Sequence, residues 1–205
     1  MIADDWNGEQ DMRTVIVYRS YHHGNTKKLI DAIVAAHPEV DLIDVDGLGK
    51  KETPDLSGYQ LVGYASGIYY GKFDKTVMRV ASETMRDGDF IFTICTYGSK
   101  DNGFSQDIQN LCKLHQAAYV GGYGCNGYDS YGPFKLVGGL QEKHPTDLEI
   151  EAAAAFYDAL LDKFGETIAV QRAKRDAQDA YAAAHAKPGV AERVKDAAGK
   201  LGGKR

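Results

Sequence analysis

The stretch TVIVYRSYHHGNT, residues 14–26, decides the fold class of this chain. Its first five residues are β-branched or aromatic, which predicts a short buried strand. Beyond the loop at 19–25, apolar residues recur at 29, 30, 33 and 34, the spacing of a helix that buries one face. A buried strand that leads through a glycine-containing loop into an amphipathic helix is the first half of a βαβ unit.

The same alternation of strand and helix continues along the chain. Glu149 would lie in the first turn of the last helix, with Thr146 or Asp147 as its N-cap. The pattern predicts an α/β fold: a doubly wound, five-stranded parallel sheet with right-handed crossovers and helices on both faces. The further elements expected are strands at 40–45, 60–66, 90–95 and 117–123, and helices at 73–84, 104–115 and 148–163.

Composition divides the 205 residues into three parts. Residues 1–12 carry four acidic side chains and no basic one, without apolar periodicity, so we expect a disordered acidic arm. Residues 13–164 hold the predicted elements. Residues 165–205 are rich in Ala and Lys but poor in large apolar side chains, which predicts a helical or disordered tail.

The charge and cysteine content exclude several classes of protein. The net charge is −5, from 24 Lys and Arg against 29 Asp and Glu, which disfavours nucleic-acid binding. No apolar run is long enough to span a membrane, and the acidic N-terminus is not a secretory signal. Three cysteines without a CxxC pair argue against a disulfide scaffold and a zinc site. We therefore expect a cytoplasmic protein without a metal centre.

Parallel sheets of this kind bind ligands beyond the carboxyl ends of their strands, so the loops after the strands are candidate sites. The first loop places Ser20, Gly24 and Thr26 at the start of a helix, where backbone N–H groups and the helix dipole attract anions. It lacks the lysine of a GxxxxGK[ST] phosphate loop. An N-capping turn without a ligand would use the same residues, and the local sequence leaves both interpretations open.

The segment SYHHGNT at Ser20–Thr26 resembles the phosphate loop of the flavodoxin family, in which Ser or Thr and two or three variable residues precede Gly-Asn-Thr. Asp55–Phe73 resembles the third strand and first flavin loop of that family. The resemblance covers residues 13–164 and implies strand order 2-1-3-4-5 and non-covalently bound FMN. Many flavodoxins have Thr or Ser where this chain has His22 and His23, so imidazole or backbone N–H groups would replace one hydroxyl donor.

The resemblance also implies that the loops after the third and fourth strands enclose the isoalloxazine ring. Tyr69, Tyr70 and Tyr97 are the candidates for stacking on it, because aromatic faces pair well with a flat ring. Gly67 and Gly71 are candidates for a peptide that turns to bond flavin N5. The residues assigned to FMN in this way are Ser20, Tyr21, His22, His23, Gly24, Asn25, Thr26, Ser66, Gly67, Ile68, Tyr69, Tyr70, Gly71, Thr96, Tyr97, Gly98 and Asn102.

The loop after the fifth strand contains GYGCNG at 122–127, which fits the spacing GxGxxG. It follows the last strand and no helix opens behind it, so it does not indicate a dinucleotide site. The span 125–144 is long and is predicted to hold an extra strand at 134–137. Cys125 could approach a flavin here, but no basic neighbour is present to activate its thiol, and Cys95 and Cys112 are expected in the core.

The sequence therefore predicts an FMN-binding electron carrier in which the cofactor carries the redox chemistry and no side chain acts as acid or base. Asp101 could contribute negative charge near flavin N1. The alternative on the same fold is an FMN-dependent NAD(P)H or quinone oxidoreductase with a pocket near Cys125–Pro133. A flavin-free interaction domain would not need Ser, Gly, Asn and Thr together in the first loop. Residues 13–164 carry 15 basic and 20 acidic side chains, which predicts redox partners with basic surfaces.

Overall fold

The computed structural model describes residues 13–49, 51–98, 103–128, 141 and 143–185, so the arm at 1–12 and the extra strand expected at 134–137 lie outside the described residues. The strands are β1 (Thr14–Arg19), β2 (Asp41–Asp44), β3 (Leu61–Gly67), β4 (Phe90–Tyr97) and β5 (Ala118–Asn126). The helices are α1 (Asn25–Ala36), α2 (Lys75–Thr84), α3 (Gln106–His115) and α4 (Asp147–His185), with a short 3₁₀ helix, η1 (Val45–Gly47).

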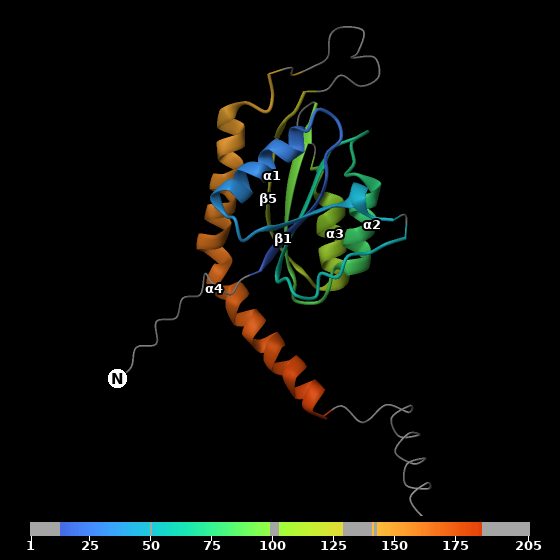
Figure 1. Ribbon diagram of the computed structural model, residues 1–205, viewed down its shortest axis with the longest axis vertical. Coiled ribbons are helices and arrows are strands. Elements are labelled where there is room, and N and C mark those ends of the chain that lie inside the picture. The colour runs from blue at the N-terminus through green and yellow to red at the C-terminus, as the bar shows by residue number, and fades with distance from the viewer. Residues whose placement is uncertain (1–12, 50, 99–102, 129–140, 142, 186–205) are drawn as a thin grey trace, which may run out of the picture. The chain divides into compact units, whose positions relative to one another are not determined.

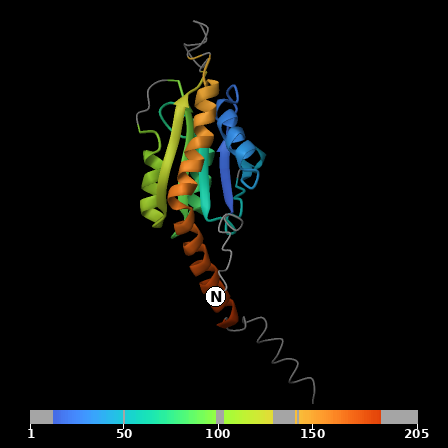
Figure 2. The ribbon, with the colours of Figure 1, turned by 90° about the vertical axis from the view of Figure 1, so that its left-hand side faces the viewer.

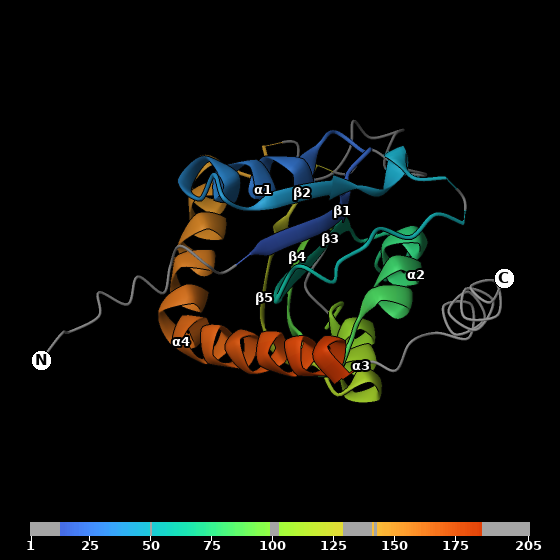
Figure 3. The ribbon, with the colours of Figure 1, turned by 60° about the horizontal axis from the view of Figure 1, so that its bottom comes forward.

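The five strands form one parallel sheet in the order β2-β1-β3-β4-β5, which confirms the predicted fold and can be followed in Figure 3. Helix α1 and the first part of α4 cover one face of the sheet, and α2 and α3 cover the other (Figures 1 and 2). The strand order reverses at β1, which lies between β2 and β3. The carboxyl ends of β1 and β3 therefore flank the switch point at which such sheets bind ligands.

Both faces of the sheet are apolar because each strand sends alternate side chains to opposite sides. In β1, Ile16 packs into the core beneath α1 and α4, whereas Val15 and Val17 pack toward α2 and α3. In β4, Phe92 packs into the core beneath α1 and α4, and Ile91 packs toward α2 and α3. Burial on both sides explains why these strands appear in the sequence as unbroken apolar runs.

Near the centre of the sheet, Gly63 of β3 lies beside Phe92 of β4. A Cβ atom on Gly63 would stand 2.4 Å from Phe92 Cζ, so only glycine fits beneath this ring. The Phe92 ring packs in turn against Tyr157 of α4, with ring centroids 5.8 Å apart. The missing side chain thus makes room for a contact between the sheet and α4.

Helix α4 begins with the capping arrangement that the sequence predicts. The N–H of Glu149 donates to Thr146 Oγ1 (3.3 Å), and the N–H of Thr146 donates to Glu149 Oε2 (2.7 Å). His144 Nδ1 lies 2.7 Å from the same carboxylate oxygen. Burial works against the charged form, but the hydrogen bonds from Thr146 and His144 outweigh it and lower the pKa of Glu149.

Helix α4 continues past residue 164, where the sequence places the end of the domain, and ends at His185. Ile168 is fully buried, four residues after the partly buried Phe164, so the apolar stripe of α4 continues beyond the expected boundary. The first compact unit accordingly ends at Ala169, and a second begins at Val170. Among the helices that the described residues form, none has the length and apolar character needed to cross a membrane.

Strand β5 extends three residues beyond its expected end at 123, because residues 124–126 pair in register with residues 95–97 of β4. Most of the GYGCNG segment is therefore extended strand, which agrees with its rejection as a dinucleotide fingerprint. A Cβ on Gly124 would lie 3.0 Å from Tyr97 Cε1, so glycine lets the Tyr97 ring lie against β5.

Candidate functional site

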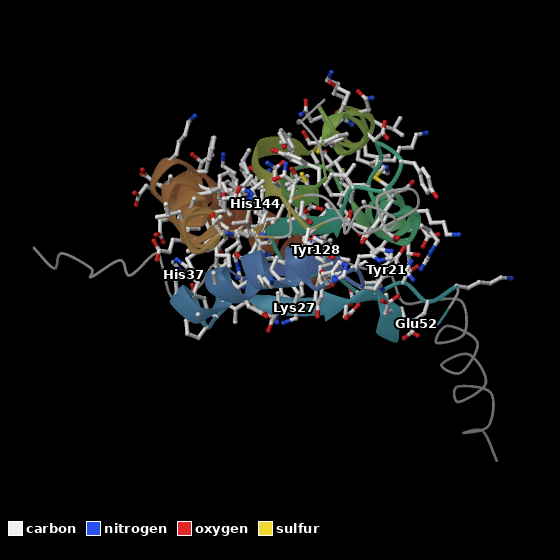
Figure 4. All side chains as sticks on the ribbon, turned by 90° about the horizontal axis from the view of Figure 1, so that it is seen from above. Tyr21, Lys27, His37, Glu52, Tyr128 and His144 are labelled. Atoms are coloured by element: carbon white, nitrogen blue, oxygen red, sulfur yellow. The ribbon has the colours of Figure 1, made fainter. Side chains whose placement is uncertain are left out.

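The loops that follow the strands meet at one edge of the sheet, which Figure 4 shows from above with Tyr21 and Tyr128 labelled. The first of these loops, Ser20–Gly24, turns the chain from β1 into α1. His23 and Gly24 both have positive φ, 55° and 65°, and α1 begins at Asn25. Glycine adopts this left-handed conformation without steric cost, which explains its place at the turn.

The first turn of α1 presents backbone donors to this loop, since the first N–H groups of a helix have no acceptor within it. The N–H of Lys27 donates to Ser20 Oγ (3.1 Å), and that of Lys28 donates to the Gly24 carbonyl (3.0 Å). Within the described residues, the N–H groups of Asn25 and Thr26 have no hydrogen-bond partner. These two amides and the Ser20 hydroxyl, which can still donate its hydrogen, are donors of the kind that could hold an anion.

Thr26 joins the first loop to the fourth strand. Its Oγ1 lies 2.8 Å from Thr96 Oγ1, and both side chains are buried. Either hydroxyl can donate. When Thr96 donates, the hydrogen of Thr26 remains available to a ligand at the start of α1.

Asn25 joins the same loop to the segment after β5. Its Nδ2 donates to the Tyr128 carbonyl (2.8 Å), and the His23 and Tyr128 rings lie 4.3 Å apart. Gly127 has no room for a side chain, because a Cβ there would lie 2.9 Å from Asn25 Nδ2. The sequence analysis did not assign Gly127 or Tyr128 to the site. No local pattern indicates this contact, which exists because α1 packs across β3 and β4 toward β5.

The loop after β3 makes a tight two-residue turn. The backbones of Tyr69 and Lys72 exchange hydrogen bonds of 2.9 and 3.1 Å, and Tyr70 and Gly71 between them have φ values of 53° and 77°. The Tyr70 side chain is 86% exposed. Earlier in the loop, Ser66 Oγ accepts from the Asp74 N–H (3.1 Å), and the Ile68 N–H donates to the Thr96 carbonyl (2.8 Å).

Aromatic contacts join the loops after β1 and β3. The Tyr21 and Tyr69 rings are stacked, with centroids 5.3 Å apart and planes inclined by 19°. The His22 ring lies 4.5 Å from Tyr21 and 5.3 Å from Tyr69. Burial raises the pKa of Tyr69 to about 12. Since His22 and His23 both face aromatic rings, the arrangement favours backbone amides over imidazoles as the anion donors.

Arg19, which the sequence analysis did not assign to the site, supports this aromatic cluster from the end of β1. Its guanidinium carbon lies 4.7 Å from the Tyr21 ring centroid. Its nitrogens lie 2.7 Å from Asp46 Oδ1 and 3.1 Å from Asp74 Oδ2. Asp74 is buried and also caps α2, accepting from the N–H of Thr76 (2.7 Å).

The loop after β4 is described up to Gly98, so Asn102 and Asp101 lie outside the described residues. The Tyr97 hydroxyl donates to the Gly124 carbonyl (3.2 Å), and its ring lies 5.5 Å from that of Phe104. Of the three tyrosines expected to stack on a flavin, Tyr97 is thus held against β5, Tyr69 is held by Tyr21, and Tyr70 is exposed.

The cysteines lie in the core as free thiols. Burial raises the pKa of Cys125 to about 12 and that of Cys112 to about 11. A nucleophilic cysteine needs the opposite shift, so the structure argues against the reactive interpretation of Cys125. In the part of the chain that the structure describes, no group of His, Cys, Asp and Glu side chains is arranged to hold a metal ion.

The described residues fit a phosphate monoester attached to a flat, largely apolar group. The amides at the start of α1 that have no acceptor among the described residues suit the phosphate, because the helix dipole adds to their hydrogen bonds. The loops Ser66–Gly71 and Thr96–Gly98 follow adjacent strands and bring aromatic rings and glycine backbone to the same edge. This combination of an anion site and aromatic loops is the chemistry that FMN requires.

Comparison with known proteins agrees with this geometry. The chain matches the flavodoxin domain family over residues 15–113. It is 32% identical over 153 residues to an uncharacterised protein of Methanocaldococcus jannaschii, an alignment that covers 73% of this chain and 99% of that protein.

Solved structures with a similar fold have low sequence identity to this chain. Oxidised flavodoxin 2 from Bacillus cereus superposes with a TM-score of 0.53 at 15% identity, covering 74% of this chain and 99% of that one. A Fusobacterium nucleatum flavodoxin variant bound to flavin mononucleotide superposes with a TM-score of 0.50 at 11% sequence identity, and the match covers 75% of this chain and 98% of that one. Rubredoxin oxygen:oxidoreductase from Desulfovibrio gigas superposes with a TM-score of 0.54 at 9% sequence identity, and the match covers 81% of this chain and 39% of that one. By its sequence matches and its sheet, this chain belongs to the flavodoxin family.

Proposed function

We propose that this domain binds FMN non-covalently and carries electrons between redox proteins. The observation that carries the proposal is the first loop. It places two amides that have no partner among the described residues, those of Asn25 and Thr26, at a helix N-terminus beside the switch point of the sheet. Bound FMN would supply one- and two-electron redox chemistry, and the protein would supply binding and orientation.

The site residues divide between the two ends of the cofactor. The Ser20 hydroxyl and the amides of Asn25 and Thr26 would hold the phosphate, with Asn25 also fixing Tyr128 above the loop. Tyr69 and Tyr97, from the loops after β3 and β4, would flank the ring. Their existing contacts with Tyr21 and with the Gly124 carbonyl limit how far either ring can turn.

FMN titration of the purified full-length chain tests this proposal. We expect the flavin absorption bands to shift and the flavin fluorescence to be quenched as FMN binds, because a stacked ring is quenched and shielded from water. Riboflavin, which lacks the phosphate, should bind at least about tenfold more weakly, since hydrogen bonds to charged groups contribute about 1.5–3 kcal/mol. A purified protein without flavin bands that also takes up no FMN would refute the proposal.

The same preparation separates a carrier from the oxidoreductase alternative. The loaded protein is mixed with NADH or NADPH without oxygen, and the flavin absorbance is followed. A carrier should be reduced slowly or not at all by the nucleotide alone. Rapid bleaching would favour the enzyme.

A cytoplasmic location also belongs to this proposal, supported by three cysteines that remain free thiols.

A further inference from the structure

Two tyrosines are exposed beside the proposed flavin site. Tyr21, which is labelled in Figure 4, is 51% exposed. Tyr70 is 86% exposed, and the loops that carry the two residues touch through the Tyr21–Tyr69 stack. Tyr70 also has a φ of 53°, a left-handed conformation that disfavours a large L side chain. Strained residues of this kind occur at functional sites, where the surroundings hold them in place.

The same surface carries lysines in electrostatically unfavourable positions. Lys72 and Lys75 are exposed, and within the described residues neither makes an ion pair. Lys75 is the first residue of α2, and Lys28 lies in the first turn of α1. Neither first turn contains an acidic residue. Cations are disfavoured at helix N-termini, so lysines there raise the positive potential at this edge without stabilising the helices.

Two acidic side chains near these lysines are paired with an arginine. Asp74 is buried and Asp46 is half-exposed, and both pair with Arg19. The one guanidinium thus offsets half of the charge of these two carboxylates. Lys72 in the loop after β3 and Lys75 at the start of α2 are both exposed.

We propose that Tyr21, Tyr70, Lys72 and Lys75, the tyrosine–lysine patch, dock the acidic face of a redox partner protein. The redox nature of the partner rests on the proposed function. Tyr70 stands at the tip of a two-residue turn, and exposed tyrosines with flanking lysines suit a protein interface, in which aromatic residues anchor and charges steer. Small nucleotides prefer concave pockets. The net charge of the domain predicts a basic partner, whereas the charges placed beside the site favour an acidic one.

The first test maps the patch without any flavin. The full-length, ¹⁵N-labelled protein is titrated at low salt with hexacyanochromate(III), an inert trivalent anion that broadens nearby amide signals. We expect broadening at 70–75 in addition to any at the first-loop amides of residues 25 and 26, and none at 70–75 from the cation hexaamminechromium(III). Because this measurement needs no FMN, its result does not depend on whether the proposed function is right. Broadening by the cation at these amides, or by the anion evenly over the protein, would overturn the proposal.

The second test uses protein probes of opposite charge. An acidic plant-type 2Fe–2S ferredoxin should shift the amide signals of the patch, and basic cytochrome c should not. The double variant Lys72→Glu/Lys75→Glu should weaken ferredoxin binding by about tenfold or more, as expected when steering charges are reversed. The control Lys113→Glu/Lys163→Glu makes the same change in net charge on α3 and α4, away from the patch, and should leave binding unchanged.

Three results would contradict the assignment. Cytochrome c could bind the patch in place of ferredoxin, the control pair could weaken ferredoxin binding as much as the patch pair, or NADH could shift the patch signals while ferredoxin does not. The last result would identify the surface as a nucleotide site.

Discussion

The hydroxyl oxygens of Thr26 and Thr96 lie 2.8 Å apart in the core, one at the start of α1 and the other near the end of β4. The bond fixes the proposed phosphate loop to the sheet. It also means that Thr26 has two possible roles, one structural and one toward a ligand, which matched substitutions can separate.

Replacing either threonine with valine removes the same buried hydrogen bond. Thr26→Val and Thr96→Val should therefore each lower the free energy of unfolding by about 1 kcal/mol. Only Thr26→Val also removes a hydroxyl at the start of α1, so it alone should weaken FMN binding more than riboflavin binding. Equal losses for the two flavins in Thr26→Val would contradict a role for its hydroxyl at the phosphate.

Gly63→Ala should destabilise the domain, because the new Cβ would stand 2.4 Å from Phe92 Cζ. The ring has little space to withdraw, since Tyr157 packs against it at 5.8 Å. Overpacking of a core typically costs about 1–3 kcal/mol, which urea unfolding would detect. The double variant Gly63→Ala/Phe92→Leu should regain part of this loss. An unchanged unfolding midpoint in the single variant would show that the ring moves aside freely.

Stability should fall at alkaline pH. Burial raises the pKa of Tyr69 and of Tyr157 to about 12, against about 10 in the unfolded chain. The folded state then holds more protons than the unfolded state between about pH 10 and 12, so stability is full below pH 10 and declines through that window. Urea midpoints measured from pH 8 to 12, with tyrosinate absorbance, would show this. Tyr157→Phe should make the decline shallower, and a parent protein with flat midpoints would refute the linkage.

The thiol of Cys125 should be unreactive in the native protein. Burial raises its pKa to about 12, so almost no thiolate exists at pH 8. Iodoacetamide should label Cys125 slowly in the folded protein and rapidly in urea, as peptide mass spectrometry can measure. Fast native labelling at this position alone would revive the interpretation of Cys125 as a redox or nucleophilic residue.

Tyr70→Asn should stabilise the domain while weakening partner docking. Asparagine adopts positive φ more readily than tyrosine, and relief of the strain at a φ of 53° is worth about 1 kcal/mol. Thermal unfolding should therefore move to higher temperature, while the ferredoxin complex becomes weaker. A variant that is less stable than the parent would mean that the Tyr70 ring contributes packing in the folded domain.

The parts of the fold that were predictable from sequence are those in which local pattern and tertiary packing agree. Strands β1 and β4 are buried on both faces, so Thr14–Tyr18 and Phe90–Cys95 appear as apolar runs. The end of β5 was missed because Gly124–Asn126 lack strand propensity, and β4 supplies the pairing that makes them extended. The sequence gives no sign that Ile168 is buried, because it follows several small and polar residues, although it keeps the helical spacing from Phe164.

The site was predictable only where its residues are neighbours in sequence. The loop at Ser20–Thr26 is a continuous motif, and the structure places it at the switch point. The bond from Asn25 to Tyr128 joins residues 103 positions apart, and the pairing of Arg19 with Asp74 joins residues 55 apart. Such contacts depend on how α1 crosses the sheet and on which strand ends are adjacent, and neither appears in a local pattern.

Helix α4 lies late in the sequence, which affects the order in which the parts of the fold can form during synthesis. The hydrogen bond from Tyr157 to Thr14 joins residues 143 positions apart, and Ile168 completes the same core. During synthesis from the N-terminus, α1 can cover part of this face early, but the part beneath α4 stays uncovered until residues 153–168 have been made. A ribosome stalled before α4 is made would carry a nascent chain in which the part of the sheet that α4 covers is still open to chaperones.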